Sequence, residues 1–378
     1  MDRADLRHFL NLRFFAPFTS RSGYGTLARG FAHGLSHHIP ELKYHLLRDF
    51  PGGTLKLPPR YTRLMSEPAD DVSPLIRLDV PWRKRYDGYG SEWAAIYTMF
   101  EASPLPRDWV KVFPDSFDQV IVPSQFCKEL FLESGLRNIS VIKPGMNGEL
   151  YNPDVAPLRM DTRSFVILFV GEFNHRKGWD VAVRSFARAF GPGDDVTLIV
   201  KTWSPVFEEE RIRDTIVQTM LNTGSEEKLP HVQLLLNMIP DAFMPSLYRM
   251  ADVLLMPSRS EAYGLPAAEA QACGIPVIAT NHGALRELVF SESGFLIPVR
   301  EMKPAEPTGM TWDFYKGLMF PEPDENYIVD LLKRLYDNTG ILSDMARNAS
   351  ERILKRSWKM AAEELITLLK ATKNDNYT

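Results

Sequence analysis

Residues 253–289 read VLLMPSRSEAYGLPAAEAQACGIPVIATNHGALRELV, and this stretch decides the fold. Its apolar run at 253–256 predicts a buried strand, and residues 267–273 have the Ala, Glu and Gln content of a helix. Gly274 is typical of the position that follows a helix end, and residues 276–280 predict a second strand. The stretch therefore predicts a βαβ unit, and open α/β sheets bind ligands at the carboxyl ends of their strands.

Two carboxylates make this unit specific. Seven residues separate Glu261, in the loop, from Glu269 in the helix, which is roughly one and a half helical turns further on. Both carboxylates can face one crevice, where their oxygens accept hydrogen bonds from sugar hydroxyls. The backbone N–H groups of Tyr263, Gly264 and Leu265, at the start of the helix, suit a phosphate. A nucleotide sugar requires this combination, with hydrogen-bond acceptors for its hydroxyls beside hydrogen-bond donors for its phosphates.

An E-x7-E spacing alone is more often a solvated helix face. Between Pro-Ser and Gly-Ile-Pro-Val-Ile-Ala-Thr, however, it resembles the signature of retaining glycosyltransferases of the GT-B fold, specifically glycosyltransferase family 4. The resemblance covers most of residues 90–300. It implies an α/β protein with two Rossmann-like domains that face a central cleft, and a C-terminal helix that crosses back to the first domain. It also implies that Glu269 binds the ribose hydroxyls and that Glu261 binds the sugar hydroxyls and acts in catalysis.

A second charged loop, GEFNHRKG at residues 171–178, follows an apolar run at 165–170 and precedes an amphipathic helix. Arg176 and Lys177 can neutralise a diphosphate, with each charge-assisted hydrogen bond contributing about 1.5–3 kcal/mol. The loop resembles the family's Gly-x-Phe-x-x-x-Lys-Gly region, which binds the donor phosphates. It departs from many relatives at Glu172, where they carry Arg. The alternative interpretation is an exposed basic turn.

The expected first domain has a glycine loop, SRSGYG at residues 20–25, between a strand predicted at 8–15 and a helix predicted at 26–35. Such a loop can let backbone approach a phosphate, although turns also use glycine for its positive φ angles. The family resemblance implies that Gly23 and Gly25 face the donor diphosphate and the acceptor.

Two further candidates follow predicted strands. Glu101 lies beyond a strand at 94–100, and in family members with a similar Thr-Met-Phe-Glu stretch this position is near the transferred sugar, which makes it a second catalytic candidate. The alternative is that it caps the helix near Trp109. The resemblance also places the nucleobase against the loop after the strand at 232–236, which includes Met238.

The composition excludes several classes of protein. The 378 residues are 44% hydrophobic and 24% charged, with a net charge of −4, so a basic nucleic-acid footprint is missing. No apolar run approaches the roughly 20 residues of a membrane span, and the first residues lack a signal-peptide pattern. Cys127 and Cys273 have no metal-ligand spacing and indicate reduced packing residues. We therefore expect a cytoplasmic protein, with peripheral contact at the inner face of a membrane as an open possibility.

The domain organisation follows from the chain order. We expect an N-terminal acceptor-binding domain at 1–157, a nucleotide-sugar-binding domain at 158–350 and a returning helix at 351–378. Residues 301–325 carry several prolines and predict an irregular excursion. Residues 40–90, which include the basic run WRKRY at 82–86, have no assignment and are where acceptor choice should be encoded.

The predicted function is that of a retaining glycosyltransferase that moves a sugar from a UDP- or GDP-sugar to a glycan, a lipid-linked or a small-molecule hydroxyl acceptor. Positioning and positive charge from side chains and a helix end supply the catalysis, so no metal and no cofactor are expected. No unmodified nucleic acid is expected as a partner. Two alternatives stay open: a non-catalytic nucleotide-sugar-binding partner subunit, and an epimerase or hydrolase of the same fold.

Overall fold

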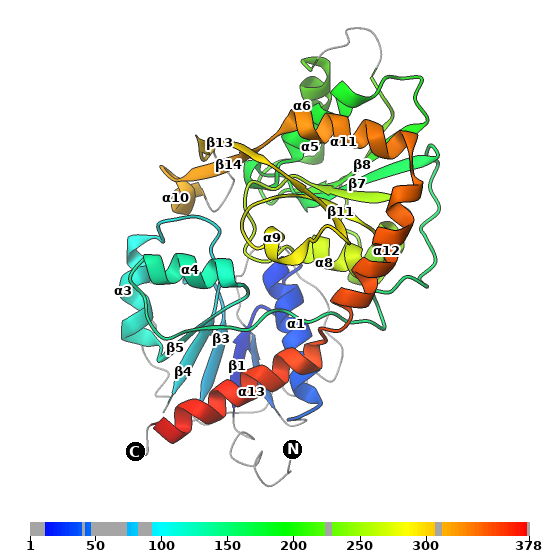
Figure 1. The fold of residues 1–378 in the computed structure, drawn as a ribbon. Helices are drawn as coiled ribbons and strands as arrows, with labels where there is room; N and C mark the ends of the chain where they lie inside the picture. Colours follow the sequence, from blue (N-terminus) through cyan, green and yellow to red (C-terminus); the bar gives the residue numbers. More distant parts are fainter. Residues whose placement is uncertain are drawn as a thin grey trace. The chain divides into compact units, whose positions relative to one another are not determined.

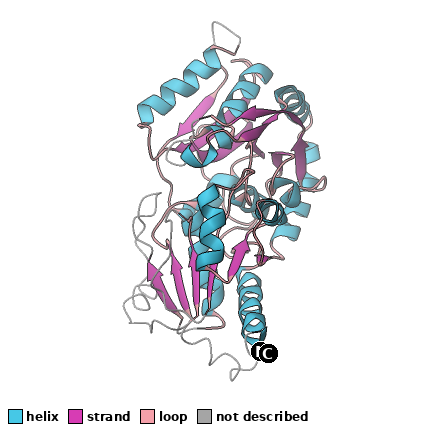
Figure 2. Cartoon of the chain, turned by 90° about the vertical axis from the view of Figure 1, so that its left-hand side faces the viewer, coloured by secondary structure: helices cyan, strands magenta, loops and turns pink. Residues whose placement is uncertain are grey.

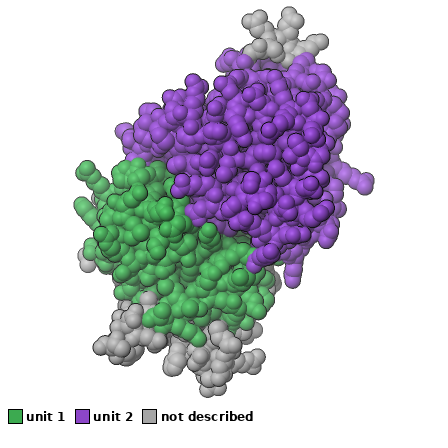
Figure 3. Space-filling model, viewed as in Figure 1, with its two compact units in different colours: residues 1–147, 356–378 green, residues 148–355 purple. Residues whose placement is uncertain are grey.

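The computed structural model of the chain describes residues 12–39, 42–46, 74–81, 93–223, 229–306 and 312–375. These residues form two compact units, one from residues 1–147 with 356–378 and one from residues 148–355 (Figure 3). The basic run at 82–86 lies outside the described residues. The second unit begins earlier than the boundary predicted after residue 157. The Leu158 N–H donates to the Ser246 carbonyl oxygen at 2.8 Å, and Tyr151 lies 6.4 Å from Tyr248 between ring centroids, so this connection packs on the second unit.

The first unit is a parallel sheet with strand order β2-β1-β3-β4-β5-β6. Its strands are β1 (Arg13–Ala16), β2 (Lys43–Leu46), β3 (Leu75–Leu78), β4 (Ala94–Tyr97), β5 (Gln119–Val122) and β6 (Ile139–Val141). Its described helices are α1 (Gly23–Ser36), α3 (Arg107–Ser116), α4 (Gln125–Glu133) and α13 (Trp358–Asp375) (Figure 1).

The C-terminal helix α13 packs on α1, as the sequence predicts. Trp358 meets Phe31 edge to face at 5.3 Å between ring centroids. A Cβ atom on Gly30 would lie 2.2 Å from the Trp358 ring, and one on Gly34 would lie 2.2 Å from the Trp358 carbonyl oxygen. Glycine at these two helical positions therefore allows α13 to approach closely.

The second unit is a parallel sheet with strand order β12-β11-β10-β7-β8-β9. Its strands are β7 (Phe165–Glu172), β8 (Val196–Trp203), β9 (Val232–Leu235), β10 (Val253–Met256), β11 (Val277–Thr280) and β12 (Gly294–Ile297). Its helices include α5 (Trp179–Ala189), α6 (Glu209–Leu221), α7 (Met244–Arg249), α8 (Leu265–Ala272), α9 (Leu285–Leu288), α11 (Glu325–Asp337) and α12 (Gly340–Ile353). In Figure 2 its strands run between helices. Numbered within this unit, the order is 3-2-1-4-5-6, that of a dinucleotide-binding Rossmann fold.

The core of the second unit shows why its strands read as apolar runs. Alternate residues of β7, β8 and β10 pack against α5, α6 and α11, so one face of the sheet is buried by three helices. On the other face, Val166, Leu168, Ile199, Leu254 and Met256 are buried as well. Strands covered on both faces need continuous rather than alternating hydrophobicity, and β10 accordingly lies at its predicted bounds.

The expectation of an irregular excursion at 301–325 was wrong in part. Strands β13 (Val299–Pro304) and β14 (Met319–Pro323) pair antiparallel, and the short helix α10 (Trp312–Tyr315) lies between them in the chain. Prolines suggested a loop, but an isolated pair of strands has only edges, where a missing N–H is tolerated. We refer to β13 and β14 together as the hairpin.

Candidate active site

The two charged loops predicted from the sequence leave the sheet at one place. Strands β7 and β10 are neighbours, and the residues that follow them, 173–178 and 257–264, begin at their carboxyl ends. Between β7 and β10 the strand order reverses. Open α/β sheets bind ligands outside the carboxyl ends of their strands at such a switch point. The fold thus brings both predicted loops to the position where a ligand site is expected.

The loop after β7 is held in a tight turn. The side-chain oxygen of Asn174 accepts a hydrogen bond from the Lys177 N–H at 3.1 Å, and residues His175–Lys177 form one turn of 3-10 helix. Gly178 then adopts a left-handed conformation with φ 70°. A Cβ there would lie 2.0 Å from the Pro257 carbonyl oxygen, so only glycine allows the two loops to pack together.

Arg176, Lys177 and Glu261 form an ion cluster, which we call the donor cluster. The Lys177 ammonium lies 2.7 and 2.9 Å from the two Glu261 carboxylate oxygens, and the Arg176 guanidinium lies 3.3 Å from one of them. Arg176 also donates to the Ser260 carbonyl oxygen at 2.9 Å. The side chains of Arg176, Lys177 and Glu261 are 12%, 16% and 7% exposed. Two cations thus share the Glu261 carboxylate.

The electrostatics keep Glu261 ionised. Burial alone would raise the pKa of its carboxyl, but the charges of Lys177 and Arg176 outweigh burial and hold that pKa below its usual value. A third loop fixes the backbone of Glu261, because the Ala284 N–H donates to the Glu261 carbonyl oxygen at 3.0 Å. The neighbouring Gly283 has φ 62°, and a Cβ there would lie 2.8 Å from the same oxygen.

Helix α8 begins at Leu265, two residues before the predicted start. Gly264 caps it in a left-handed conformation with φ 98°, and its carbonyl oxygen accepts from the N–H groups of Ala267 and Ala268 at 3.0 and 3.1 Å. Pro266 lies in the first turn, where a residue without an N–H suits the helix. The predicted phosphate-binding residues, of which Tyr263 is half-buried, therefore form the N-terminal end of α8.

Glu269 lies in the second turn of α8, where its carboxylate accepts a hydrogen bond from the Tyr248 hydroxyl at 2.8 Å. Burial raises the pKa of Tyr248, and the negative charge of Glu269 raises it further, so the phenol remains a donor. The structure thus joins Glu269 to α7. Met238, the predicted nucleobase contact, is half-buried beyond the end of β9.

The first-unit candidates differ from expectation. Gly23 and Gly25 belong to the first turn of α1 and not to a loop before it. A Cβ on Gly25 would lie 1.9 Å from the Ser20 carbonyl oxygen, so close packing explains this glycine. The helix begins three residues before the predicted start at residue 26, because the packing of Gly25 against Ser20 overrides the low helix propensity of glycine.

Tyr24, between these glycines, reaches the end of β4. Its hydroxyl lies 3.5 Å from the Thr98 hydroxyl and accepts from the Met99 N–H at 3.3 Å. Burial raises the pKa of Tyr24, and the nearby charge of Glu101 adds to the effect. Glu101 is half-buried, and α3 begins after Pro106, so Glu101 does not cap that helix.

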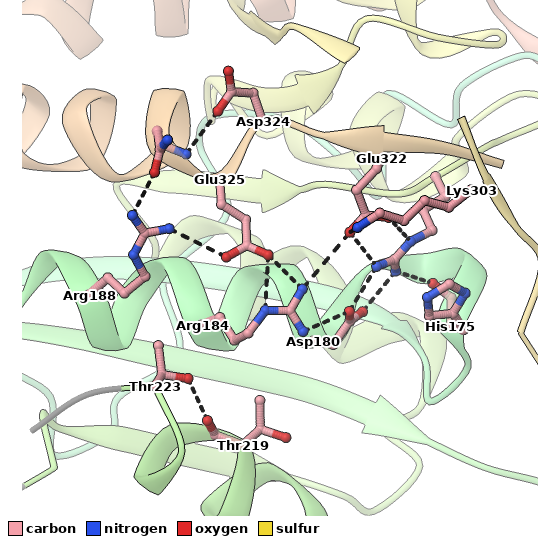
Figure 4. Close-up of polar contacts among 12 residues, drawn as sticks. His175, Asp180, Arg184, Arg188, Thr219, Thr223, Lys303, Glu322, Asp324 and Glu325 are labelled. Atoms are coloured by element: carbon pink, nitrogen blue, oxygen red, sulfur yellow. Dashed lines mark hydrogen bonds and ion pairs between the residues drawn. The ribbon is translucent and has the colours of Figure 1, made fainter. Parts of the chain in front are cut away.

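Sequence reasoning missed Arg259, whose side chain is only 2% exposed. Its guanidinium binds both carboxylate oxygens of Asp180 at 2.8 Å and both of Glu322 at 2.8 and 2.9 Å. Figure 4 labels the two carboxylate residues. We call Arg259, Asp180 and Glu322 the anchor cluster. Its only sequence signal was an arginine at the end of a buried strand, and the two carboxylates are 79 and 63 residues away.

Two negative findings apply to the described residues alone. Among residues 12–39, 42–46, 74–81, 93–223, 229–306 and 312–375, no group of three or more His, Cys, Asp or Glu side chains could hold a metal ion. Within the same ranges, none of the helices is long and apolar enough to cross a membrane.

Comparison with solved structures defines the class of fold. The Anabaena protein Alr3699/HepE, solved with UDP-glucose, matches 95% of this chain and 99% of its own at a TM-score of 0.67 and 16% identity. Sucrose-phosphate synthase from Thermosynechococcus elongatus matches 96% and 99% at a TM-score of 0.64 and 18% identity. With two parallel six-stranded sheets, the predicted GT-B fold is confirmed.

Sequence comparison adds a family match. Residues 153–306 match the family of glycosyl transferases group 1, and this range contains the whole donor cluster. D-inositol 3-phosphate glycosyltransferase from Arthrobacter sp. (strain FB24) is 28% identical over 60% of this chain and 48% of its own length. The enzyme of that name from Corynebacterium glutamicum (strain R) is 30% identical over 63% and 53%. The chain thus spans about half the length of these curated relatives.

Proposed function

We propose that this protein is a retaining glycosyltransferase of family 4 that moves a sugar from a nucleoside diphosphate sugar to a hydroxyl acceptor. The observation that carries the proposal is the donor cluster at the switch point of a Rossmann-type sheet. Its two cations suit the diphosphate leaving group, and it lies within the glycosyl transferases group 1 match. The activities named for the two relatives support the same class of reaction.

The roles of the donor residues follow from their chemistry. Lys177 and Arg176 stabilise the charge that develops on the diphosphate as the glycosidic bond breaks. The N-terminal end of α8, with Gly264 and Leu265, donates backbone N–H groups to a phosphate. Glu261 accepts from sugar hydroxyls, and Glu269 accepts from the ribose hydroxyls while Tyr248 fixes its orientation.

The donor is a UDP- or GDP-sugar in this proposal. The base lies against the loop of Met238, and the acceptor is a glycan, a lipid-linked or a small-molecule hydroxyl compound. Glu101, beyond β4, contacts the reacting sugar or the acceptor. Because the cations come from side chains and a helix end, catalysis proceeds without a metal ion. Cytoplasmic location with peripheral contact at a membrane surface fits this role.

Nucleotide binding tests the proposal. Calorimetry with UDP, GDP, ADP and dTDP on the wild type and on Glu269→Ala should show one nucleotide that binds the wild type and loses most of its affinity in the variant. The titration is repeated with EDTA, which should leave that affinity unchanged. Transfer is then measured with the matching nucleotide sugar. No binding of any of the four at millimolar concentration would remove the donor-site assignment and favour a partner subunit that lacks activity.

A further inference from the structure

The anchor cluster connects three parts of the second unit. Arg259 follows β10, Asp180 lies in the first turn of α5, and Glu322 belongs to β14 of the hairpin. Burial raises the pKa of Asp180, but its hydrogen bonds with Arg259 and that cation's charge lower it to about 2. The Asp180 carboxylate therefore stays charged beside the buried guanidinium.

Arg259 also ties together the two loops that carry the donor cluster. Its backbone N–H donates to the Arg176 carbonyl oxygen at 2.7 Å, and its guanidinium donates to the His175 carbonyl oxygen at 2.6 Å. One residue therefore fixes the backbone on which Arg176 and Lys177 stand. It is two residues from Glu261 along the chain, so the same residue also sets the path of the loop that carries the carboxylate.

The hairpin touches this arrangement at two points. Glu322 holds the Arg259 guanidinium from one side, and Glu306, just beyond β13, lies 3.7 Å from the His175 imidazole. Lys303 of β13 lies 3.9 Å from Glu322 (Figure 4). Burial, followed by the charge of Arg259, lowers the pKa of His175. Glu322 thus fastens the hairpin to Arg259 in the loop after β10 and, through Arg259, to the carbonyl oxygens of His175 and Arg176 in the loop after β7.

We infer that Arg259 and Glu322 are positioning residues of the donor site, through which the hairpin holds the loops at 173–178 and 257–264 in the geometry that binds the nucleotide sugar. The identity of the ligand rests on the proposed function, whereas the holding of the two loops rests on the contacts of Arg259 and Glu322 alone. Displacing a binding group by about 1 Å can cost on the order of 100-fold in rate. The rigid fork of Arg259, held by four charge-assisted bonds, limits such displacement.

The chain offers a matched control in Arg184. Its guanidinium also binds Asp180, at 3.0 Å, and Glu325 at 2.6 Å, and it lies 4.0 Å from Glu322, but its side chain is 30% exposed. None of its ion pairs or hydrogen bonds within the described residues reaches either loop. Arg184→Met thus removes a second, more exposed cation from both carboxylates and leaves the hydrogen bonds of Arg259 to the two loops intact.

Hydrogen–deuterium exchange separates positioning from a purely structural role. Glu322→Gln keeps the side-chain shape and removes its charge, so we expect faster exchange in peptides covering 173–178 and 257–264. Arg259→Lys, which keeps a charge without the fork, should do the same. Arg184→Met should leave both peptides within twofold of the wild type. These measurements use the full chain without ligand, so they decide the loop part even if the proposed function is wrong.

The same variants are then titrated with the nucleotide that binds the wild type. We expect Glu322→Gln to weaken binding about tenfold or more and Arg184→Met to leave it within twofold. If Glu322→Gln lowers the melting temperature but leaves loop exchange and nucleotide affinity at wild-type values, the positioning role is overturned and the cluster only stabilises the fold. If the wild type binds no nucleotide while loop exchange responds as expected, the proposed function fails and the loop coupling stands.

Discussion

The donor cluster and the anchor cluster meet in the loop after β10, which carries both Glu261 and Arg259, yet the two clusters are built from opposite proportions of charge. In the donor cluster, two cations share Glu261, and their side chains remain 12% and 16% exposed. In the anchor cluster, two carboxylates surround Arg259, which is 2% exposed. A charged group that water still reaches keeps part of its hydration, whereas a buried ion needs hydrogen bonds to all of its donors or acceptors.

This difference separates binding from support. A site that must attract an anion keeps cations that solvent still reaches, and its internal salt bridge can rearrange around a ligand. A cluster that must hold backbone in place satisfies every donor of its guanidinium. We therefore expect variants of the anchor cluster to change stability first, and variants of the donor cluster to change turnover first.

The largest effect is expected from Arg259→Met. Removing one partner of a buried ion cluster leaves Asp180 and Glu322 without their main counter-charge, which typically costs about 3–5 kcal/mol of unfolding free energy. Urea denaturation followed by circular dichroism measures this loss. Arg184→Met, with its 30% exposed side chain, should cost less than about 1 kcal/mol. Equal losses in both variants would contradict the distinction between a buried and a solvated cation in this cluster.

Lys177→Met is expected to act on turnover. Removing one preorganised charge from a developing oxyanion typically lowers kcat by about 10²–10³-fold, which corresponds to about 2.7–4 kcal/mol. Stability should change far less, because Arg176 remains beside Glu261. Steady-state kinetics and thermal melting on one preparation measure both effects, with Lys177→Arg as the variant that retains the charge. A variant with wild-type kcat would show that this ammonium does not assist the leaving group.

Lys201 extends the comparison to a charge without a counter-ion. It lies on β8, is 5% exposed, and makes no ion pair or side-chain hydrogen bond within the described ranges. Burial lowers its pKa from 10.5 to about 8. Below about pH 8 the buried ammonium is charged, and its desolvation destabilises the folded state. Lys201→Met removes this charge and should raise the unfolding free energy at pH 7 by about 3 kcal/mol.

The pH dependence of this gain has a definite sign. Between about pH 8 and pH 10.5 the unfolded state binds more protons at Lys201 than the folded state, so wild-type stability rises with pH through this window. The advantage of Lys201→Met should therefore shrink as the pH rises and vanish above about 10.5. Urea titrations at pH 7, 9 and 10 would test it, and a variant less stable than the wild type at pH 7 would disprove the cost.

The sequence was informative where local pattern decides the structure. A continuous apolar run placed β10 at its bounds, because a strand buried on both faces needs such a run. The E-x7-E spacing and the Arg-Lys pair selected three residues that the fold brings together in the donor cluster. The prediction that Glu261 contacts sugar while the cations contact phosphate stays a prediction.

Contacts between residues far apart in the sequence could not be predicted from local sequence pattern. Nothing near Arg259 in the sequence indicates that it binds Glu322, since that carboxylate lies in a proline-rich stretch that reads as loop. Likewise, the role of Gly178 becomes visible only when the Pro257 carbonyl oxygen is seen 2.0 Å from where its Cβ would be. Such contacts depend on which loops leave the sheet side by side, which strand order decides and periodicity does not.

The smallest effect is expected from Tyr248→Phe, which tests whether a support outside both clusters also matters. The Tyr248 hydroxyl donates to Glu269 at 2.8 Å, and a hydrogen bond to a charged group contributes about 1.5 kcal/mol or more. Because Glu269 is half-buried and water can replace the phenol in part, we expect the variant to lose about 1 kcal/mol of unfolding free energy.

If Glu269 binds the ribose, nucleotide affinity should fall about fivefold, since its carboxylate is no longer held in one orientation. Calorimetry alongside urea denaturation separates the two losses. An unchanged affinity with reduced stability would place Glu269 with the anchor cluster, as support for the fold, and would leave the ribose hydroxyls to another acceptor.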